Sequence, residues 1–290
     1  MITPSFIIQI FIGGILMGGI YSFIALGLTL IFGVMKVINF AHGALLMLGM
    51  YTSYWLLTIF GIDPYLSVLV TIPLFFVIGW LIQRFLIESV LDAPHLIQIV
   101  ITLGLALFLE NIALFLWSPD YRSVQVSYQE ATILLGDISI SFTRLMSFIL
   151  AISGTCALYL FLKWTNVGKA IRATADDKEG AILMGINYKQ VYYIAFGIGA
   201  ACVGMAGSFI TPVFFVDPYI GGVFVLMAFV VVIMGGIGNF LGALICGLIV
   251  GVAESFGAIF MPGSMKRVLP FTLLIIIMLF KPTGLFGRRT

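Results

Sequence analysis

Charged side chains are scarce in this sequence. Lys and Arg number 14 and Asp and Glu number 12 in 290 residues, so 9% of the chain is charged while 62% is hydrophobic. An ordinary soluble domain is roughly 25% charged, and this chain therefore has too few polar side chains to cover a water-facing surface. The basic residues are scattered and the net charge is only +2, which gives no electrostatic footprint for binding nucleic acid.

Residues suited to chemistry are also scarce. The three cysteines lie in apolar segments at wide and unequal spacing, which indicates neither a disulfide framework nor a metal site. Gly168-Lys169 is followed by Ala170 and lacks the earlier glycine of a phosphate-binding loop, so we do not expect this chain to bind ATP. No nucleophile has a base at helical spacing. We expect no catalytic residue and no cofactor, and energy for any active process would come from another subunit.

Long apolar runs occupy most of the chain. Residues 1–35 contain no charged side chain or histidine, and about 20 apolar residues cross the hydrocarbon core of a bilayer. This run is too long for a secretory signal and lacks its positive start, so we expect it to remain as a span. Turn residues and charges divide the apolar sequence into predicted spans at 6–32, 37–62, 65–83, 96–117, 145–162, 191–211, a short one before Gly235, 240–260 and 268–280. These nine crossings, or eight if 222–240 is re-entrant, predict an all-α fold, a polytopic membrane helical bundle of about 8–9 transmembrane helices in one domain, residues 1–290.

Two polar segments interrupt the apolar sequence. Residues 118–143 alternate between apolar and polar side chains at 124–128 and at 138–141, with Gly136-Asp137 between them, which predicts a small hairpin outside the membrane. Residues 163–189 hold five basic and three acidic side chains in a helix-forming context. At helical spacing Ile171, Ala175, Ile182 and Ile186 share one face, which predicts an amphipathic helix on the membrane surface.

The distribution of Lys and Arg gives an orientation, because positive residues favour the cytoplasmic side. If residues 163–189 are cytoplasmic, ten basic residues lie on that face and four lie outside. The ten are Lys36, Arg84, Lys163, Lys169, Arg172, Lys178, Lys189, Lys281, Arg288 and Arg289, and the four are Arg122, Arg144, Lys266 and Arg267. This arrangement places the N-terminus and the 118–143 hairpin outside and the C-terminus in the cytoplasm.

A short sequence occurs twice in the chain. Asn39-Phe40-Ala41-His42-Gly43-Ala44-Leu45 recurs, one residue shorter, as Asn239-Phe240-Leu241-Gly242-Ala243-Leu244. Paired interrupted segments predict pseudo-repeated halves with broken helices beside the substrate route, and chance resemblance in a low-diversity apolar sequence is the alternative. On the first interpretation the pathway candidates are Asn39, His42, Gly43, Gly236 and Asn239, although His42 is also typical of a hydrogen-bonding residue at a helix end.

Two acidic residues, Glu110 and Glu254, lie in otherwise apolar spans. Ionisable groups at such positions usually face the interior of a bundle or an aqueous cavity, so both are candidates for the substrate pathway. The alternatives are snorkelling to the membrane interface or an ion pair with Arg122, Arg144 or Lys266, and the sequence leaves them open.

Glycines are spaced four residues apart at Gly14 and Gly18, at Gly238 and Gly242, and at Gly247 and Gly251. Small residues at this spacing let neighbouring helices approach closely in lipid. We interpret them as packing residues that take no part in binding.

The polar segment and the region before Asn39 carry a family resemblance. Glu179-x-Ala181-x-x-x-Gly185 is similar to the loop by which permeases of ABC importers dock on their ATPases, although Gly180 replaces a second alanine and the later hydrophobic-Pro part is absent. Gly168-Lys169-Ala170-Ile171-Arg172-Ala173, Gly185-Ile186-Asn187, and residues 27–33 and 37–43 are more specific. In these motifs and over nearly its whole length the chain resembles the permease subunits of branched-chain amino-acid ABC transporters, of the LivH type.

The resemblance implies a transport subunit of the cell inner membrane with several partners. They would be a second homologous permease subunit, two cytoplasmic ABC ATPase subunits and an extracytoplasmic substrate-binding protein. ATP would be hydrolysed by the ATPases, and the coupling contact would be made by Gly168, Lys169, Arg172, Asp176, Glu179, Ala181 and Gly185. A merely solvated connector is the alternative for this segment.

Other functions stay open at this stage. The resemblance favours branched-chain amino acids as substrates, and urea or short amides are alternatives within the same family. A stand-alone secondary transporter or channel would need ion-coupling acids at mid-membrane or a selectivity ring, and neither pattern is evident in the sequence.

Overall fold

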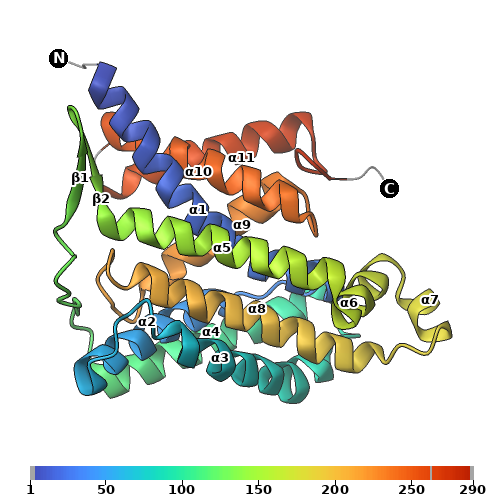
Figure 1. Cartoon of the computed structure of the whole chain (residues 1–290). Helices are drawn as coiled ribbons and strands as arrows, with labels where there is room; N and C mark the ends of the chain where they lie inside the picture. The colour runs from blue at the N-terminus through green and yellow to red at the C-terminus, as the bar shows by residue number, and fades with distance from the viewer. Residues whose placement is uncertain (1–3, 262, 288–290) are drawn as a thin grey trace.

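Helices form nearly all of the protein. The computed structural model describes residues 4–261 and 263–287 (Figure 1). Its helices are α1 Pro4–Met35, α2 Ala41–Phe60, α3 Val68–Ile82, α4 His95–Trp117, α5 Phe142–Trp164, α6 Asn166–Asp176, α7 Lys178–Leu183, α8 Tyr188–Ile210, α9 Ile220–Gly235, α10 Phe240–Phe260 and α11 Val268–Phe280. A π turn at Gln83–Ile87 and a 3-10 turn at Glu88–Val90 prolong α3, a 3-10 turn at Gly263–Arg267 precedes α11, and strands β1 Thr132–Leu135 and β2 Ile138–Ser141 form one hairpin.

The predicted fold class, a polytopic helical membrane protein, is confirmed. Seven helical segments of the described chain are long and apolar enough to cross a membrane, namely α1, α2, α3 with its prolongation, α4, α5, α8 and α10. The other two predicted spans form α9, of 16 residues, and α11, of 13 residues. At 1.5 Å per residue these two helices are roughly 24 and 20 Å long, shorter than the hydrocarbon core of about 30 Å.

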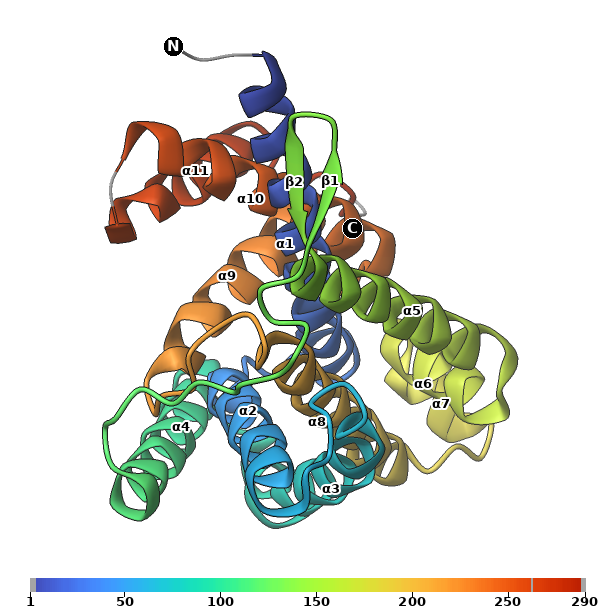
Figure 2. The ribbon, with the colours of Figure 1, turned by 60° about the vertical axis from the view of Figure 1, so that its left-hand side comes forward.

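The helices share one long direction, and the polar segments lie at its two ends. Figure 1 shows the β hairpin and the N-terminus at one end and α6, α7 and the C-terminus at the other. Figure 2 shows α1 near the centre, with α10 and α11 on one side, α2, α3 and α4 on another, and α5, α6 and α7 on a third. The basic residues Arg288 and Arg289 lie outside the described residues.

Helix α1 packs against α10 without side chains between the two backbones. A Cβ at Gly18 would lie 2.6 Å from Leu248 Cα, and one at Gly251 would lie 2.3 Å from the backbone nitrogen of Gly18. The Ser22 hydroxyl donates to the Leu244 carbonyl across the same interface at 2.8 Å. The interpretation of the spaced glycines as packing residues is therefore confirmed.

The two halves of the repeated sequence occupy similar places in the fold. Each lies at a turn between two helices, from α1 to α2 and from α9 to α10, and in each pair the second helix begins at or beside its phenylalanine. The last turn of α1 adjoins the α9–α10 turn, because a Cβ at Gly33 would lie 3.0 Å from Gly238 Cα.

The hairpin differs from the prediction in its first strand. Leu135 pairs with Ile138 across the two-residue connection Gly136-Asp137, and Gly136 has a φ of +62°. A connection this short fixes the register, so the partner of the second strand must be residues 132–135, and the prediction of a first strand at 124–128 is wrong.

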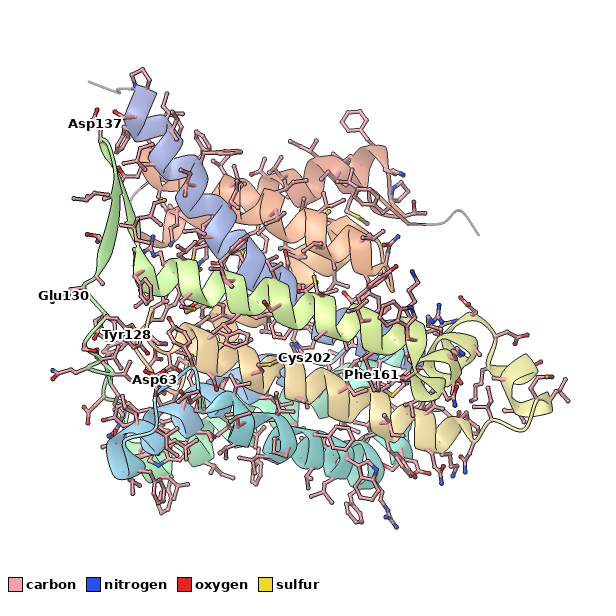
Figure 3. The ribbon with its side chains drawn as sticks, in the orientation of Figure 1. Asp63, Tyr128, Glu130, Asp137, Phe161 and Cys202 are labelled. Carbon is pink, nitrogen blue, oxygen red and sulfur yellow. The ribbon has the colours of Figure 1, made fainter. Side chains whose placement is uncertain are left out.

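Residues 118–131 instead form a strap across this end of the bundle. Tyr128 donates to the Asp63 carboxylate at 2.6 Å (Figure 3), and its ring stacks on that of Tyr65 with centroids 5.6 Å apart. Burial together with the hydrogen bond to Asp63 raises the pKa of Tyr128, and burial raises the pKa of Tyr65 to about 12. The backbone of Arg122 pairs with that of Val216 through two hydrogen bonds of 2.9 and 2.7 Å. The strap therefore joins the α2–α3 and α8–α9 connections.

Candidate functional site

The segment predicted to be one amphipathic helix is two helices. Asp177 has extended backbone angles, φ −148° and ψ 103°, and it separates α6 from α7. Its carboxylate accepts a hydrogen bond from the Glu179 backbone N–H at 3.0 Å, which is the N-cap interaction that starts a new helix. The prediction of an unbroken helix is wrong because this cap competes with helix continuation.

Helix α7 is fixed at its other end by Gly185. The Gly185 N–H donates to the Ile182 carbonyl and the Ile186 N–H donates to the Ala181 carbonyl, at 2.9 and 3.0 Å. These two bonds form a Schellman motif, which requires a left-handed residue after the helix, and Gly185 has a φ of +81°. Asp177 and Gly185 thus define a six-residue helix, with Ala181 as its buried residue.

The tip of α7 exposes large apolar side chains. Leu183 is 87% exposed and Met184 is 83% exposed, and Ile182 is also exposed, so Ile182 does not pack against the bundle as Ile171 does. Ile171 is buried and Ala175 and Ile186 are partly buried, as predicted, while Lys169, Arg172, Asp176 and Glu179 are exposed. Sequence reasoning overlooked Leu183 and Met184, although an apolar run just before a helix-ending glycine in a polar loop could have identified them.

Helix α6 is packed tightly onto the bundle. Thr165 ends α5 and caps α6 by accepting from the Gly168 N–H at 3.0 Å. A Cβ at Gly168 would lie 2.5 Å from both Cα and the carbonyl oxygen of Leu162. Ile171 joins the main hydrophobic core, and Arg172 donates to the Lys163 carbonyl at 3.2 Å. A movement of α6 must therefore be transmitted to α5.

Helix α7 also connects to α8 and through it to α3. The Lys178 ammonium lies 4.4 Å from the centroid of the Tyr188 ring, within the range of a cation–π interaction. The next residue, Lys189, forms an ion pair of 2.7 Å with Glu88, which also accepts a hydrogen bond from Tyr193. Because α8 packs against α1, α2 and α3, α7 is linked to the centre of the bundle by a second route.

Replacing Gly168 with leucine is expected to displace α6. The new side chain would meet the α5 backbone, which cannot move aside by rotating a bond, and overpacking of this kind costs about 1–3 kcal/mol. We expect faster proteolysis within residues 163–189 and a lower melting temperature. Equal cleavage rates in the variant and the parent protein would contradict the close packing of α6 on α5.

Of the two acidic pathway candidates, only Glu254 has partners among the described residues. It is 5% exposed and accepts from the Tyr21 hydroxyl at 2.5 Å, and its other oxygen lies 3.0 Å from Lys266 Nζ and 3.9 Å from Arg267 Nε. These contacts compensate the loss of hydration of a buried carboxylate. Glu110 is half-buried in α4, and the described part of the chain offers it no ion pair or hydrogen bond.

The candidates in the repeated sequence have different surroundings. Asn239 caps α10 by accepting from the Gly242 N–H and also donates to the Phe286 carbonyl, both at 2.9 Å, so both ends of its amide are hydrogen-bonded. Asn39 is completely buried, and neither of its amide atoms has a hydrogen-bond partner among the described residues. His42 is equally buried and donates to the Ile24 carbonyl at 3.0 Å.

The two glycine candidates allow close approach of backbones. A Cβ at Gly43 would lie 2.3 Å from the carbonyl oxygen of Gly221, so α2 and α9 touch there, and one at Gly236 would lie 2.6 Å from the backbone nitrogen of Gly287. Both positions therefore hold helices or chain segments together. The structure brings Asn39, His42 and Gly43 together with the buried core and leaves Gly236 and Asn239 beside the C-terminal segment.

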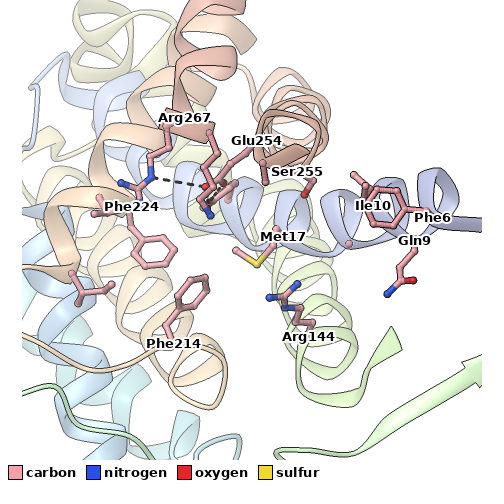
Figure 4. Close-up of a pocket in the computed structure, with 16 residues that line it drawn as sticks. Phe6, Gln9, Ile10, Met17, Arg144, Phe214, Phe224, Glu254, Ser255 and Arg267 are labelled. Atoms are coloured by element: carbon pink, nitrogen blue, oxygen red, sulfur yellow. Dashed lines mark hydrogen bonds and ion pairs between the residues drawn. The ribbon is translucent and has the colours of Figure 1, made fainter. Parts of the chain in front are cut away.

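A cavity of about 410 Å³ opens beside Glu254 (Figure 4). Its walls come from α1, the start of α5, the α8–α9 connection, α9, α10 and the 3-10 turn before α11. It lies in the half of the bundle near the hairpin, since Arg144 follows β2 by three residues and Gln9 donates to Ser139 at 3.0 Å.

The fold defines a polytopic helical membrane protein with a capped helix projecting beyond one end. Residues 10–278 match the family model described as branched-chain amino acid transport system, permease component. The chain therefore belongs to this family of ABC transporter permeases, as its motifs predicted.

Named relatives agree with this family over almost the full length. The high-affinity branched-chain amino acid transport system permease protein LivH of Salmonella typhimurium is 32% identical over 98% of this chain and 96% of its own. The corresponding protein BraD of Pseudomonas aeruginosa is 30% identical over 97% of this chain and 96% of its own. A probable branched-chain amino acid permease LivH of Methanocaldococcus jannaschii is 28% identical over 95% and 91%. No solved structure gives a significant match.

Proposed function

We propose that this chain is the transmembrane permease subunit of an ATP-driven importer that moves branched-chain amino acids inward. Its partners are a second homologous permease, two cytoplasmic ATPases and an extracytoplasmic substrate-binding protein. The protein resides in the cell inner membrane, with the N-terminus and the hairpin outside and the C-terminus and α7 in the cytoplasm. Support comes from the family and its named relatives and from the excess of Lys and Arg on the α7 side.

One observation carries the coupling part of the proposal. Helix α7 projects from the end of the bundle (Figure 1), is held rigid by Asp177 and Gly185, and presents Leu183 and Met184 to the surroundings. Two large apolar side chains exposed together on a polar loop are typical of a contact with another protein. We assign this contact to a groove of the ATPase.

The rest of the loop transmits movement of the ATPase to the bundle. Helix α6 passes it to α5 through the contact of Gly168 with Leu162, and α8 passes it to α3 through Lys189 and Glu88. A nucleotide can shift the permease between outward-open and inward-open forms only if the ATPase contacts the two forms with different free energy. Because α7 is attached to α5 and α8, we expect its contact with the ATPase to differ between the two forms.

The α7 contact is tested by charging its apolar tip. The double variant Leu183→Glu, Met184→Glu should lose most of the ATPase that co-purifies with the permease, since burying a carboxylate without a partner is unfavourable. The matched control is Leu134→Glu, which places a charge on another exposed leucine, 72% exposed, in the hairpin at the opposite end. We expect the amount of co-purified ATPase to fall at least about tenfold in the double variant, which corresponds to a loss of about 1.4 kcal/mol in binding free energy.

Two results would oppose the proposed coupling to an ATPase. Equal recovery of the ATPase with the double variant and with Leu134→Glu would show that α7 is not the contact. Concentrative uptake of leucine by the purified chain alone in liposomes would favour a stand-alone transporter. Urea or a short amide as the transported substrate would leave the coupling intact and change only the substrate.

A further inference from the structure

The cavity near the hairpin has an excess of positive charge. Its walls carry three cations, Arg144, Lys266 and Arg267, and one carboxylate, Glu254, which leaves two positive charges. Arg144 is exposed and Lys266 and Arg267 are partly exposed, whereas Glu254 is buried, so the positive charge lies at the mouth of the cavity. An anionic group bound in the cavity would compensate it.

Two of these cations have unused hydrogen-bonding capacity. Arg267 Nε is buried and has no hydrogen-bond partner in the described part of the chain, although it lies 3.9 Å from Glu254. No ion pair joins Arg144 to an acidic side chain among the described residues, and Figure 4 shows its guanidinium directed toward the space between Met17 and Phe214. Guanidinium groups pair especially well with carboxylates because two parallel N–H donors match the two oxygens.

The remainder of the wall is apolar and aromatic. Phe214 and Phe224 meet with centroids 5.4 Å apart in an edge-to-face arrangement, and they face the charged residues across the cavity together with Met17 (Figure 4). The volume of about 410 Å³ falls in the range of about 300–1,000 Å³ that is usual for small-molecule sites. The cavity therefore combines an anion-binding side with an aliphatic or aromatic side.

We infer that this cavity binds a free aliphatic α-amino acid on its way into the permease. Arg144 and Arg267 hold the carboxylate, and Met17, Phe214 and Phe224 contact the side chain. Glu254 receives the ammonium group, because each of its oxygens accepts one short contact from Tyr21 or Lys266 and keeps a second lone pair. The choice of an amino acid rests on the proposed function, whereas the charge and shape of the site do not depend on it.

An anionic lipid headgroup offers the same negative charge. A free amino acid and a lipid headgroup differ in size. They also differ in exchange, since a bound amino acid would exchange with amino acids in solution and a bound lipid would not. The experiment therefore varies both the competitor and the membrane.

The site is tested by photolabelling with photo-leucine, a leucine whose side chain carries a diazirine. The purified chain, with the subunits that accompany it, is placed in phosphatidylcholine nanodiscs with and without phosphatidylglycerol, and adducts are mapped by mass spectrometry. We expect label on Met17, Phe214 or Phe224 that excess leucine displaces and leucinamide, which lacks the carboxylate, does not. Arg144→Gln should lower the labelling at limiting probe about tenfold, and Arg84→Gln, an exposed arginine outside the cavity, should not.

Several outcomes would overturn the inference. The first is label found only outside the cavity, and the second is equal labelling of Arg144→Gln and the parent protein when both elute as monodisperse particles. The third is displacement of the label by leucinamide as effectively as by leucine. The fourth is loss of the label when phosphatidylglycerol is present, which would assign the cavity to lipid. ATP-dependent uptake is measured on the same preparation. Uptake without label in the cavity overturns this site alone, and absence of uptake with the label present overturns the proposed function alone.

Discussion

Replacing Gly185 with valine is expected to uncouple ATP hydrolysis from transport. The left-handed backbone at this position, φ +81°, costs a residue with a Cβ roughly 1–2 kcal/mol, and a β-branched side chain is among the least tolerant. A helix of only six residues is marginal without its caps, so its last turn should open and displace Leu183 and Met184. In proteoliposomes containing the complete transporter, uptake should fall at least about tenfold, and the substrate-loaded binding protein should no longer stimulate ATP hydrolysis.

Two matched variants separate coupling from general strain. Gly61 also ends a helix with a left-handed backbone, φ +67°, has open space around its Cβ as Gly185 has, and follows α2 at the hairpin end. Gly61→Val should therefore destabilise the protein by a similar amount, while ATP hydrolysis stays coupled to transport. Gly185→Asn should recover much of the activity, since Asn tolerates the left-handed conformation. Substrate-stimulated transport in Gly185→Val at the parental rate would refute the role of α7.

Most of the fold could be predicted because the bilayer imposes simple requirements. Every backbone polar group must be satisfied within the lipid, so long uncharged runs such as residues 1–35 can hardly be anything but helices. The end of α3 was harder to predict, because the helix continues past Arg84 through a π turn and a 3-10 turn to Val90. The polar residues Arg84 and Glu88 marked the passage of the chain from lipid to water, and they did not mark the end of the helix.

The loop that carries α7 shows where local sequence competes with periodicity. The apolar spacing of Ile171, Ala175, Ile182 and Ile186 is consistent with one helix, yet the Asp177 side chain captures a backbone N–H and breaks it. Both ends of α7 could have been predicted from Asp177 and Gly185 as capping residues. The motif at Glu179, Ala181 and Gly185 could thus be recognised as a family signature, but its physical basis, a short capped helix, required the backbone.

The surroundings of Glu254 could be predicted only in part. Lys266 was among the ion-pair alternatives and does form the pair, whereas Arg122 lies in the strap and Arg267 is the second cation. Tyr21 is 233 residues away in sequence, and only the packing of α1 on α10 brings it to the carboxylate. A pattern within one segment carries no information about such a contact.

Replacing Gly251 with valine is expected to prevent the bundle from folding. A Cβ at this position would lie 2.3 Å from the Gly18 nitrogen and 2.4 Å from the Gly14 carbonyl oxygen. Both obstacles are backbone atoms of α1, so no side-chain rotation can relieve the overlap, and α1 and α10 must separate. We expect destabilisation of at least about 3 kcal/mol, the upper end of the usual range for overpacking, because dispersion between closely packed helices is a principal attraction in lipid.

The measurement is the amount of monodisperse protein after detergent extraction and its thermal midpoint. Gly104→Val is the matched control, because Gly104 lies in α4 with nothing within 4 Å of its Cβ and faces the surroundings of the bundle. The same substitution should leave the midpoint of this variant close to that of the parent protein. If Gly251→Val and Gly104→Val are recovered in equal amounts with equal midpoints, then α1 and α10 do not meet at these glycines, and the cavity that depends on their contact at Tyr21 and Glu254 would lose its frame.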